Sequence, residues 1–165
     1  MRTIPLSGSK AAGRVALVDD DDYELVAQYK WLFWLPADRF RRVPYARLAS
    51  VRNGGPYLMH QMITGWPETD HRNHDGLDNR RHNLRQATRS QNLANQRPQV
   101  GRSSRFKGVC WDRFNRKWHA KVQVNYRQCN LGLFMSEEDA ARAYDAAALA
   151  AWGEFACLNF PLSAR

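Results

Sequence analysis

Cysteine is scarce in this sequence: the 165 residues contain only Cys110, Cys129 and Cys157. None of the three belongs to a Cys-x-x-Cys pair, so the sequence disfavours a zinc cluster built on thiolates. The odd number of cysteines and the lack of a signal peptide indicate a reducing compartment. We therefore expect a cytoplasmic protein that is not secreted.

A long apolar run is also missing, since no stretch approaches the roughly 20 residues that a transmembrane helix needs. The sequence therefore predicts no membrane partner. Hydrophobic residues make up 44% of the chain, which is enough for packed cores. The length limits the chain to one domain or two small ones.

Acidic residues are few in the middle of the chain. Between residues 72 and 127, 14 Lys and Arg stand against three Asp, an excess of +11. The whole chain carries +9, so the remainder is slightly acidic at −2. A positive charge this concentrated predicts an anionic polymer as the binding partner.

Residues 70–95 combine a carboxylate, an imidazole and several side-chain amides with arginines. Asp and Asn supply the oxygen ligands that a divalent cation prefers, and His is the side chain that can act as a base near neutral pH. A phosphodiester would be attracted by the arginines of this stretch, namely Arg72, Arg80, Arg81, Arg85 and Arg89. The mixture indicates hydrolysis of a phosphodiester.

The local pattern of this stretch predicts a strand, a loop, a second strand and a helix. Asp70 and His71 would end the first strand, residues 74–81 would form the loop, and residues 84–87 would form the second strand. Thr88 is a helix N-cap, with Gln91 completing a capping box. Asn92 and Asn95 would then share one face of the helix.

These residues resemble the HNH endonucleases of the ββα-metal (His-Me finger) class, in particular the homing type of phages and introns. The residues that carry the resemblance are Asp70-His71-x-Asn73, Leu77-Asp78-Asn79-Arg80, Asn83-Leu84-Arg85, Thr88 and Asn92. The resemblance implies that His71 is the general base and that Asn83 holds the loop and orients His71. Asp70 and Asn92 would hold one divalent metal, Mg²⁺ or Mn²⁺ rather than zinc.

The other histidines of the region remain open. His60 is as well explained by a place in the core as by a place in the site. His74 and His82 fit loop positions or phosphate contacts better than metal ligation. Asn95 is a weaker candidate, which would contact a metal ligand rather than the metal itself.

The first 56 residues are expected to form a leader that packs on a nuclease core spanning residues 57–97. Strands are predicted around residues 4–6 and 14–18, and again at 31–35. The four aspartates at 19–22 suit the start of a helix over residues 23–30, because the EF-hand spacing that calcium binding needs is missing. Residues 45–52 are predicted to pair with 57–63 through a turn at 53–55.

After a basic linker at residues 98–104, residues 105–161 predict three strands and a helix. Residues 106–111, 117–124 and 128–134 would form the strands, and alternation along the second gives one apolar and one polar face. Ser136 and Asp139 form a capping box for the helix, which carries a stripe of alanines.

This part resembles the plant APETALA2/ethylene-responsive DNA-binding domain. The resemblance rests on Phe106-Lys107-Gly108-Val109, Lys117-Trp118-His119-Ala120, Asn130-Leu131-Gly132-Leu133-Phe134, residues 138–148 and Leu158-Asn159-Phe160-Pro161. It implies that the sheet enters the major groove of DNA. The implied contacts are Lys107, Trp111 or Phe114, Arg113, Lys117, Lys121, Gln123 and Arg127. We further expect DNA contacts from Arg72, Arg80, Arg85, Arg89 and Arg105. Cys110, Asp112 and Asn130 depart from the plant pattern, so the plant target sequence does not carry over.

Together these features predict an α+β protein with two parts, a ββα-metal nuclease unit and a three-stranded antiparallel sheet packed on one helix. We expect a metal-dependent endonuclease that nicks double-stranded DNA in a bacterial or phage-infected cell. We expect it to act as a monomer and without a small-molecule cofactor. The main alternative is a DNA-binding regulator whose nuclease motif is inactive; an RNA-directed protein is a more distant one, since A-form RNA has too narrow a major groove for a sheet.

Overall fold

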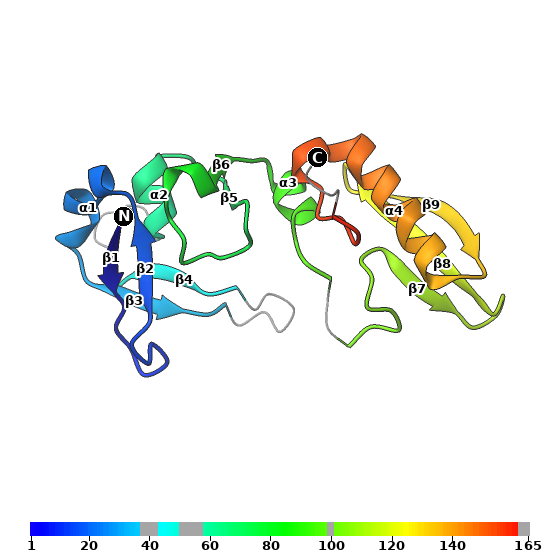
Figure 1. Ribbon diagram of the computed structural model, residues 1–165, viewed down its shortest axis with the longest axis horizontal. Coiled ribbons are helices and arrows are strands. Elements are labelled where there is room, and N and C mark those ends of the chain that lie inside the picture. Colours follow the sequence, from blue (N-terminus) through cyan, green and yellow to red (C-terminus); the bar gives the residue numbers. More distant parts are fainter. Residues whose placement is uncertain (37–42, 50–57, 99–100, 162–165) are drawn as a thin grey trace. The chain divides into compact units, whose positions relative to one another are not determined.

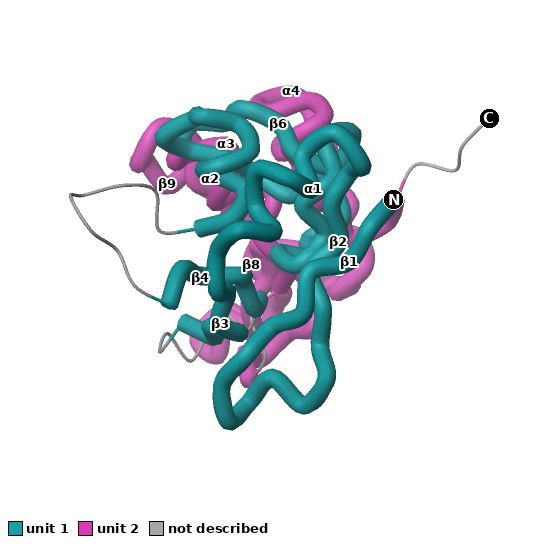
Figure 2. Tube along the Cα trace, turned by 90° about the vertical axis from the view of Figure 1, so that its left-hand side faces the viewer, with its two compact units in different colours: residues 1–88 teal, residues 89–165 magenta. Residues whose placement is uncertain are grey.

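The computed structural model of the chain describes residues 1–36, 43–49, 58–98 and 101–161 (Figure 1). The chain divides into two compact units (Figure 2), which we call the N-terminal unit, Met1–Thr88, and the C-terminal unit, Arg89–Arg165. Both contain helices and strands, so the predicted α+β class is confirmed. In the described segments no helix has the length and apolar character needed to span a membrane.

The N-terminal unit begins with two short antiparallel ladders. Strands β1 (Arg2–Pro5) and β2 (Val15–Val18) overlap the predicted ones and pair with each other, and β3 (Trp31–Trp34) pairs with β4 (Tyr45–Leu48). Helix α1 (Asp20–Ala27) connects the two ladders and starts within the aspartate run, which places three carboxylates in its first turn. A core that includes Ile4, Ala16, Val18, Val26 and Trp31 holds these elements together.

Of the predicted pairing between residues 45–52 and 57–63, the described residues keep one isolated antiparallel bridge, Arg47 with Leu58. The rest of the second segment forms a helix, α2 (Met59–Thr64), rather than a strand, and the ladder partner of β4 is β3. Met59, His60 and Ile63 are the buried residues of α2, and this spacing places them on one helical face. Gly65 ends the helix in the left-handed conformation at φ 70°. The turn predicted at 53–55 lies outside the described residues.

The two short strands around the candidate site form as predicted. Strand β5 (Thr69–His71) pairs antiparallel with β6 (Leu84–Gln86), and a 3-10 turn, η1 (Arg81–Asn83), leads into β6. Helix α3 (Arg89–Ala94) follows β6 in the chain, and the boundary between the two units falls between them.

The C-terminal unit contains the predicted three-stranded sheet, in the order β7 (Val109–Asp112), β8 (Lys117–Val124) and β9 (Arg127–Phe134). Helix α4 (Glu137–Trp152) lies along this sheet (Figure 1), and η2 (Gly153–Phe155) follows it. Ser136 caps α4, since its side chain accepts a hydrogen bond from the Asp139 amide as predicted.

Small residues let α4 approach the sheet closely. Ala140, Ala141 and Ala148 are buried and belong to the clusters that also contain Ala120 and Val122 of β8. Side chains alternate along a strand, so the neighbours of Ala120 and Val122 in β8 lie on the sheet face opposite α4. These neighbours are His119, Lys121 and Gln123, which make that face polar.

Candidate active site and DNA interface

His71 is the last residue of β5, and its imidazole is buried with 5% exposed. The ring meets the His60 ring edge-on at 4.9 Å between centroids and lies 5.8 Å from the Tyr45 ring. The Nε2 atom lies 3.5 Å from Oδ1 of Asn79. Strand β5 therefore places the predicted base inside a small aromatic cluster with one amide beside it.

Burial lowers the pKa of His71 below its ordinary value of 6.5. The hydrogen bond with Asn79 and the carboxylates of Asp70, Asp75 and Asp78 act in the opposite direction, but burial outweighs them. The imidazole is therefore neutral at neutral pH, which is the state that a general base needs.

Asp70 forms a buried ion pair with Arg85. The antiparallel register places Asp70 opposite Arg85, and Nε and Nη2 of the arginine lie 2.8 and 2.7 Å from Oδ2 of the carboxylate. Both side chains are buried. Removing either partner would leave a charge buried without compensation, so the pair holds the position of the Asp70 carboxylate.

Asn83 bridges the two ends of the loop between β5 and β6. Its Oδ1 accepts a hydrogen bond from the Asn73 amide at 3.0 Å, and its Nδ2 donates to the Asp78 carbonyl at 2.7 Å. The side chain is buried, so these bonds are shielded from water. Asn83 thus shapes the loop that faces His71.

Sequence reasoning missed the part that Asn79 and the N-terminal hairpin have in this loop. The backbone of Leu17 in β2 accepts from the Asn79 amide and donates to the Leu77 carbonyl, both at 2.8 Å. Asn79 is fully buried, and its Nδ2 donates to the same Leu77 carbonyl at 3.1 Å. In the sequence, Asp78 and Asn79 belong to the HNH-like residues, but no role was assigned to them, and this was the only sign that they matter.

The aspartate run of the leader binds the loop through Arg81. Nε and Nη2 of Arg81 donate to the buried Asp22 carboxylate at 2.8 and 2.7 Å. The Arg81 backbone amide donates to Asp19 at 2.7 Å. These carboxylates therefore have internal partners, which supports the preference for helix initiation over calcium binding.

Asp70 is the carboxylate of the site that could bind a divalent cation. Asp70 provides a carboxylate next to His71, and within the described residues no group of three or more His, Cys, Asp and Glu could hold a metal. A cation with few protein ligands keeps waters and binds phosphate oxygens, as Mg²⁺ does. Asn92 lies on α3 in the C-terminal unit, so its pairing with Asp70 on one metal remains a prediction.

The residues predicted to contact DNA differ in their surroundings. The exposed members are Arg72, Arg89, Arg105, Trp111, Arg113, Gln123 and Arg127, and Lys117 and Lys121 are half-buried on β8. Phe114, the alternative to Trp111, is 94% exposed. Several members have partners within their own unit: Arg80 binds Asp78 through two contacts of 2.7 Å, Arg85 binds Asp70, Lys107 binds main-chain carbonyls, and Arg105 lies 3.4 Å from Glu138.

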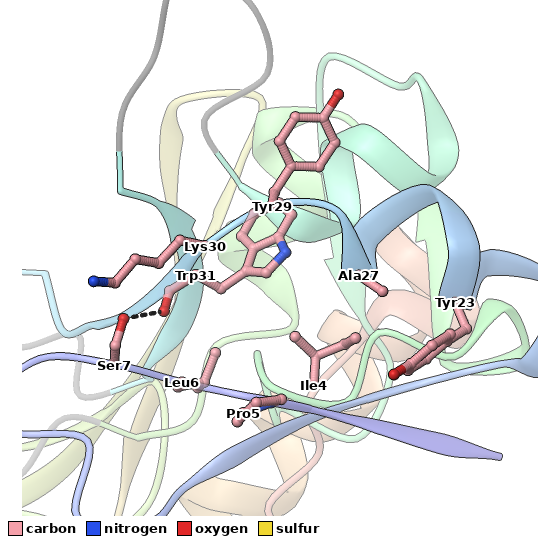
Figure 3. A pocket seen from close by; sticks show the side chains of 9 residues that line it. All are labelled: Ile4, Pro5, Leu6, Ser7, Tyr23, Ala27, Tyr29, Lys30 and Trp31. Atoms are coloured by element: carbon pink, nitrogen blue, oxygen red, sulfur yellow. Dashed lines mark hydrogen bonds between the residues drawn. The ribbon is translucent and has the colours of Figure 1, made fainter.

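A separate hollow of about 390 Å³ lies between β1, α1 and the start of β3 (Figure 3). Its wall includes Ile4, Tyr23, Tyr29 and Trp31, and Ser7 donates to the Trp31 carbonyl at 2.8 Å. None of the predicted site residues in the described part of the chain lines it. The hollow is therefore distinct from the candidate active site.

The buried pair of histidines predicts an acid-sensitive N-terminal unit. Burial, followed by the charge of His71, lowers the pKa of His60 to about 3. Below pH 6.5 the unfolded chain binds a proton at His60 that the folded chain does not, so stability falls as the pH decreases toward 3. Between pH 7 and pH 5 we expect a loss of about 2 kcal/mol from His60, measured by urea denaturation. His60→Leu should flatten this dependence; a wild-type stability that is unchanged at pH 5 would contradict it.

The comparisons with known proteins match two separate segments of the chain to two families. Residues 57–94 match the family model of the HNH endonucleases, a span that contains Asp70, His71, Asn83 and Asn92. HNH nucleases generally use a divalent metal. The resemblance to these endonucleases is thereby confirmed for this segment, and it supports a nuclease.

The curated relatives match the C-terminal region. An AP2-like ethylene-responsive transcription factor of Arabidopsis thaliana is 43% identical over 60 residues, which are 36% of this chain and 19% of that protein. An AP2/ERF and B3 domain-containing protein of Oryza sativa subsp. japonica is 48% identical over 59 residues, 36% of this chain and 16% of the other. The chain thus spans less than a fifth of the length of these two relatives. The resemblance to the AP2 DNA-binding domain is confirmed, and both matches indicate DNA binding.

Proposed function

We propose that the protein is a metal-dependent DNA endonuclease of the homing type, which nicks its target and leaves 5′-phosphate and 3′-hydroxyl ends. The observation that carries the proposal is the neutral, buried His71 beside Asp70, inside the segment that matches the HNH endonuclease family. The C-terminal unit would target the cut to particular sites on double-stranded DNA.

His71 would take a proton from the attacking water through Nδ1. The Asn79 amide donates through Nδ2 to the Leu77 carbonyl, so its oxygen faces the His71 ring. Since this oxygen only accepts hydrogen bonds, Nε2 carries the ring hydrogen and Nδ1 is the acceptor. The lowered pKa of His71 keeps that nitrogen unprotonated at neutral pH.

Asp70 and Asn92 would hold one Mg²⁺ or Mn²⁺. When bound, the metal supplies positive charge that stabilises the pentacovalent phosphate and the leaving 3′-oxygen. Arg85 would act mainly by holding the Asp70 carboxylate, because its Nε and Nη2 atoms both bind Oδ2 of that carboxylate. Asn83 would keep the loop in the shape that presents His71.

The C-terminal unit would bind DNA through the polar face of its sheet. Lys121 and Gln123 lie on the face opposite α4, and exposed arginines stand at the strand ends and turns. Charged contacts to phosphates would provide most of the affinity, and side chains on the sheet would provide sequence preference. The protein would act as a monomer in a bacterial or phage-infected cell, without a small-molecule cofactor.

Cleavage of supercoiled plasmid by the purified protein tests the proposal. We expect open circles to form with Mg²⁺ or Mn²⁺ and not with EDTA. Linear product at early times would contradict nicking by a monomer and would indicate paired cuts. DNA from the genomic neighbourhood of the gene should be cut faster than unrelated plasmid, because a homing enzyme has its target there.

The alternative is a sequence-specific DNA-binding regulator with an inactive nuclease motif. It is favoured by the relatives of the C-terminal region, which are named as transcription factors. A protein that binds the neighbouring DNA tightly but cuts it with neither metal would establish this alternative. Metal-dependent nicking would exclude it.

A further inference from the structure

Helix α3 lies at the point of the sequence where the HNH-like segment ends and the AP2-like region follows. It is the last element of the HNH match, which ends at residue 94, and it carries Asn92. Within the C-terminal unit, however, α3 packs against α4 and η2, which belong to the sheet-and-helix module. The final helix of the nuclease motif is therefore folded onto the DNA-binding module.

Lys107 caps the C-terminal end of α3. Its ammonium donates to the carbonyl oxygens of Leu93, Ala94 and Gln96, with the first at 3.3 Å and the last at 2.6 Å. The Cys157 amide adds a further bond to the Ala94 carbonyl at 3.1 Å. The last carbonyls of a helix lack partners within the helix and carry its negative dipole end, so a cation there stabilises the last turn.

The backbone of Lys107 is fixed in turn by α4. The Lys107 amide donates to Oδ1 of Asn159 at 2.7 Å, and Nδ2 of Asn159 donates to the Lys107 carbonyl at 3.1 Å. The Asp145 carboxylate on α4 accepts from both the amide and Nδ2 of Asn159, at 2.8 and 3.0 Å. A continuous series of hydrogen bonds thus joins α4 to the end of α3.

The surroundings of Lys107 differ from those of a lysine that binds phosphate. Burial lowers its pKa to about 8, and its three donors point at main-chain carbonyls. A lysine that contacts phosphates keeps its charge in solvent, where a pKa near 10.5 is ordinary. The DNA contact predicted for Lys107 is therefore the less consistent role.

We propose that Lys107 is a positioning residue that ties α3, and with it Asn92, to the DNA-binding module. The C-terminal module would then supply part of the nuclease motif as well as the targeting. The importance of Asn92 rests on the proposed function, but the attachment of α3 through Lys107 does not.

Hydrogen exchange of the full-length protein tests the attachment directly. The Asn95 and Gln96 amides, which bond the carbonyls of Gln91 and Leu93, report on the last turn of α3. In Lys107→Met we expect these amides to exchange at least tenfold faster, while the amides of β8 stay protected. The β8 amides are the internal reference, because general unfolding would accelerate them too.

Two further variants sharpen the exchange experiment. Lys121→Met makes the same chemical change on the polar face of β8, so α3 should exchange as in the wild type. Lys107→Arg keeps a charged donor and should restore part of the protection. Unchanged exchange of α3 in Lys107→Met, or equal acceleration in Lys121→Met, would overturn the proposal.

DNA binding and cleavage separate the positioning role from a phosphate contact. We expect Lys107→Met to lower kcat at saturating DNA at least tenfold, with the affinity in EDTA and its salt dependence unchanged. Lys121→Met should weaken binding and reduce the salt slope by about one. If Lys107→Met instead behaves like Lys121→Met, Lys107 contacts phosphate and the proposal is wrong. If the wild type cuts no DNA, the nuclease proposal fails while the exchange experiment still decides on α3.

Discussion

We expect His71→Ala to lower the rate of DNA nicking by roughly 1,000-fold, because a general base that accepts the proton of the attacking water contributes about this much. Affinity for DNA in EDTA should stay within a factor of two, since the imidazole is buried and is not a cationic contact. Initial rates of conversion of supercoiled plasmid and binding isotherms measure the two effects.

Two companion variants separate loss of the base from loss of structure. His71→Gln keeps most of the volume between His60 and Tyr45 but cannot act as the base, so its rate should fall as far. His82→Ala removes an exposed histidine from the same loop and should cut like the wild type. A His71→Gln protein that retains cleavage would mean that the base is elsewhere, and a His71→Ala protein that also loses DNA binding would mean that His71 is structural.

The largest expected loss of stability is that of Gly108→Ala. Gly108 has φ +75°, and a Cβ atom there would lie 1.9 Å from Cδ2 of the buried Tyr144 and 2.7 Å from the Lys121 carbonyl oxygen. The backbone conformation and the overlap with the core together should cost about 3 kcal/mol or more. Since Gly108 precedes β7, the C-terminal unit should unfold and DNA affinity should fall by at least tenfold, as followed by circular dichroism and binding.

Gly101→Ala is the matched control for this prediction. Gly101 also has a left-handed φ, +84°, but among the described residues, its chain neighbours aside, no atom lies within 4 Å of the position of a Cβ. Its substitution should cost only the conformational part, about 1 kcal/mol. Equal losses of stability in the two variants would show that the overlap with Tyr144 does not destabilise the Gly108→Ala protein.

Elements with a long, regular pattern could be predicted from the sequence. The alternation along β8 and the capping signals of α4 depend on neighbours in the chain, and both elements form at the predicted places. The segment that became α2 is short and apolar, a pattern that fits either a strand or a buried helix. Its packing against the core around Trp31 decided for the helix.

The candidate site also has residues that the sequence can predict and partners that it cannot. Asp70, His71 and Asn83 could be proposed from the motif, because their residue types and spacing lie within one short stretch. The partners of that stretch could not: Asp22 meets Arg81 across 59 residues, and Leu17 binds the loop that holds Asn79. No local pattern specifies which distant backbone or carboxylate completes a loop.

The sequence by itself determined the concentration of positive charge, the two family motifs and most of the secondary structure, because each depends on residue type and on near neighbours. Only the tertiary structure decided which charged side chains face solvent. Arg85 and Lys107 look like DNA contacts in the sequence, yet the fold buries the first against Asp70 and directs the second to the end of α3. A charge removed from water must find a partner inside the protein, and which partners are in reach is settled only when distant segments pack together.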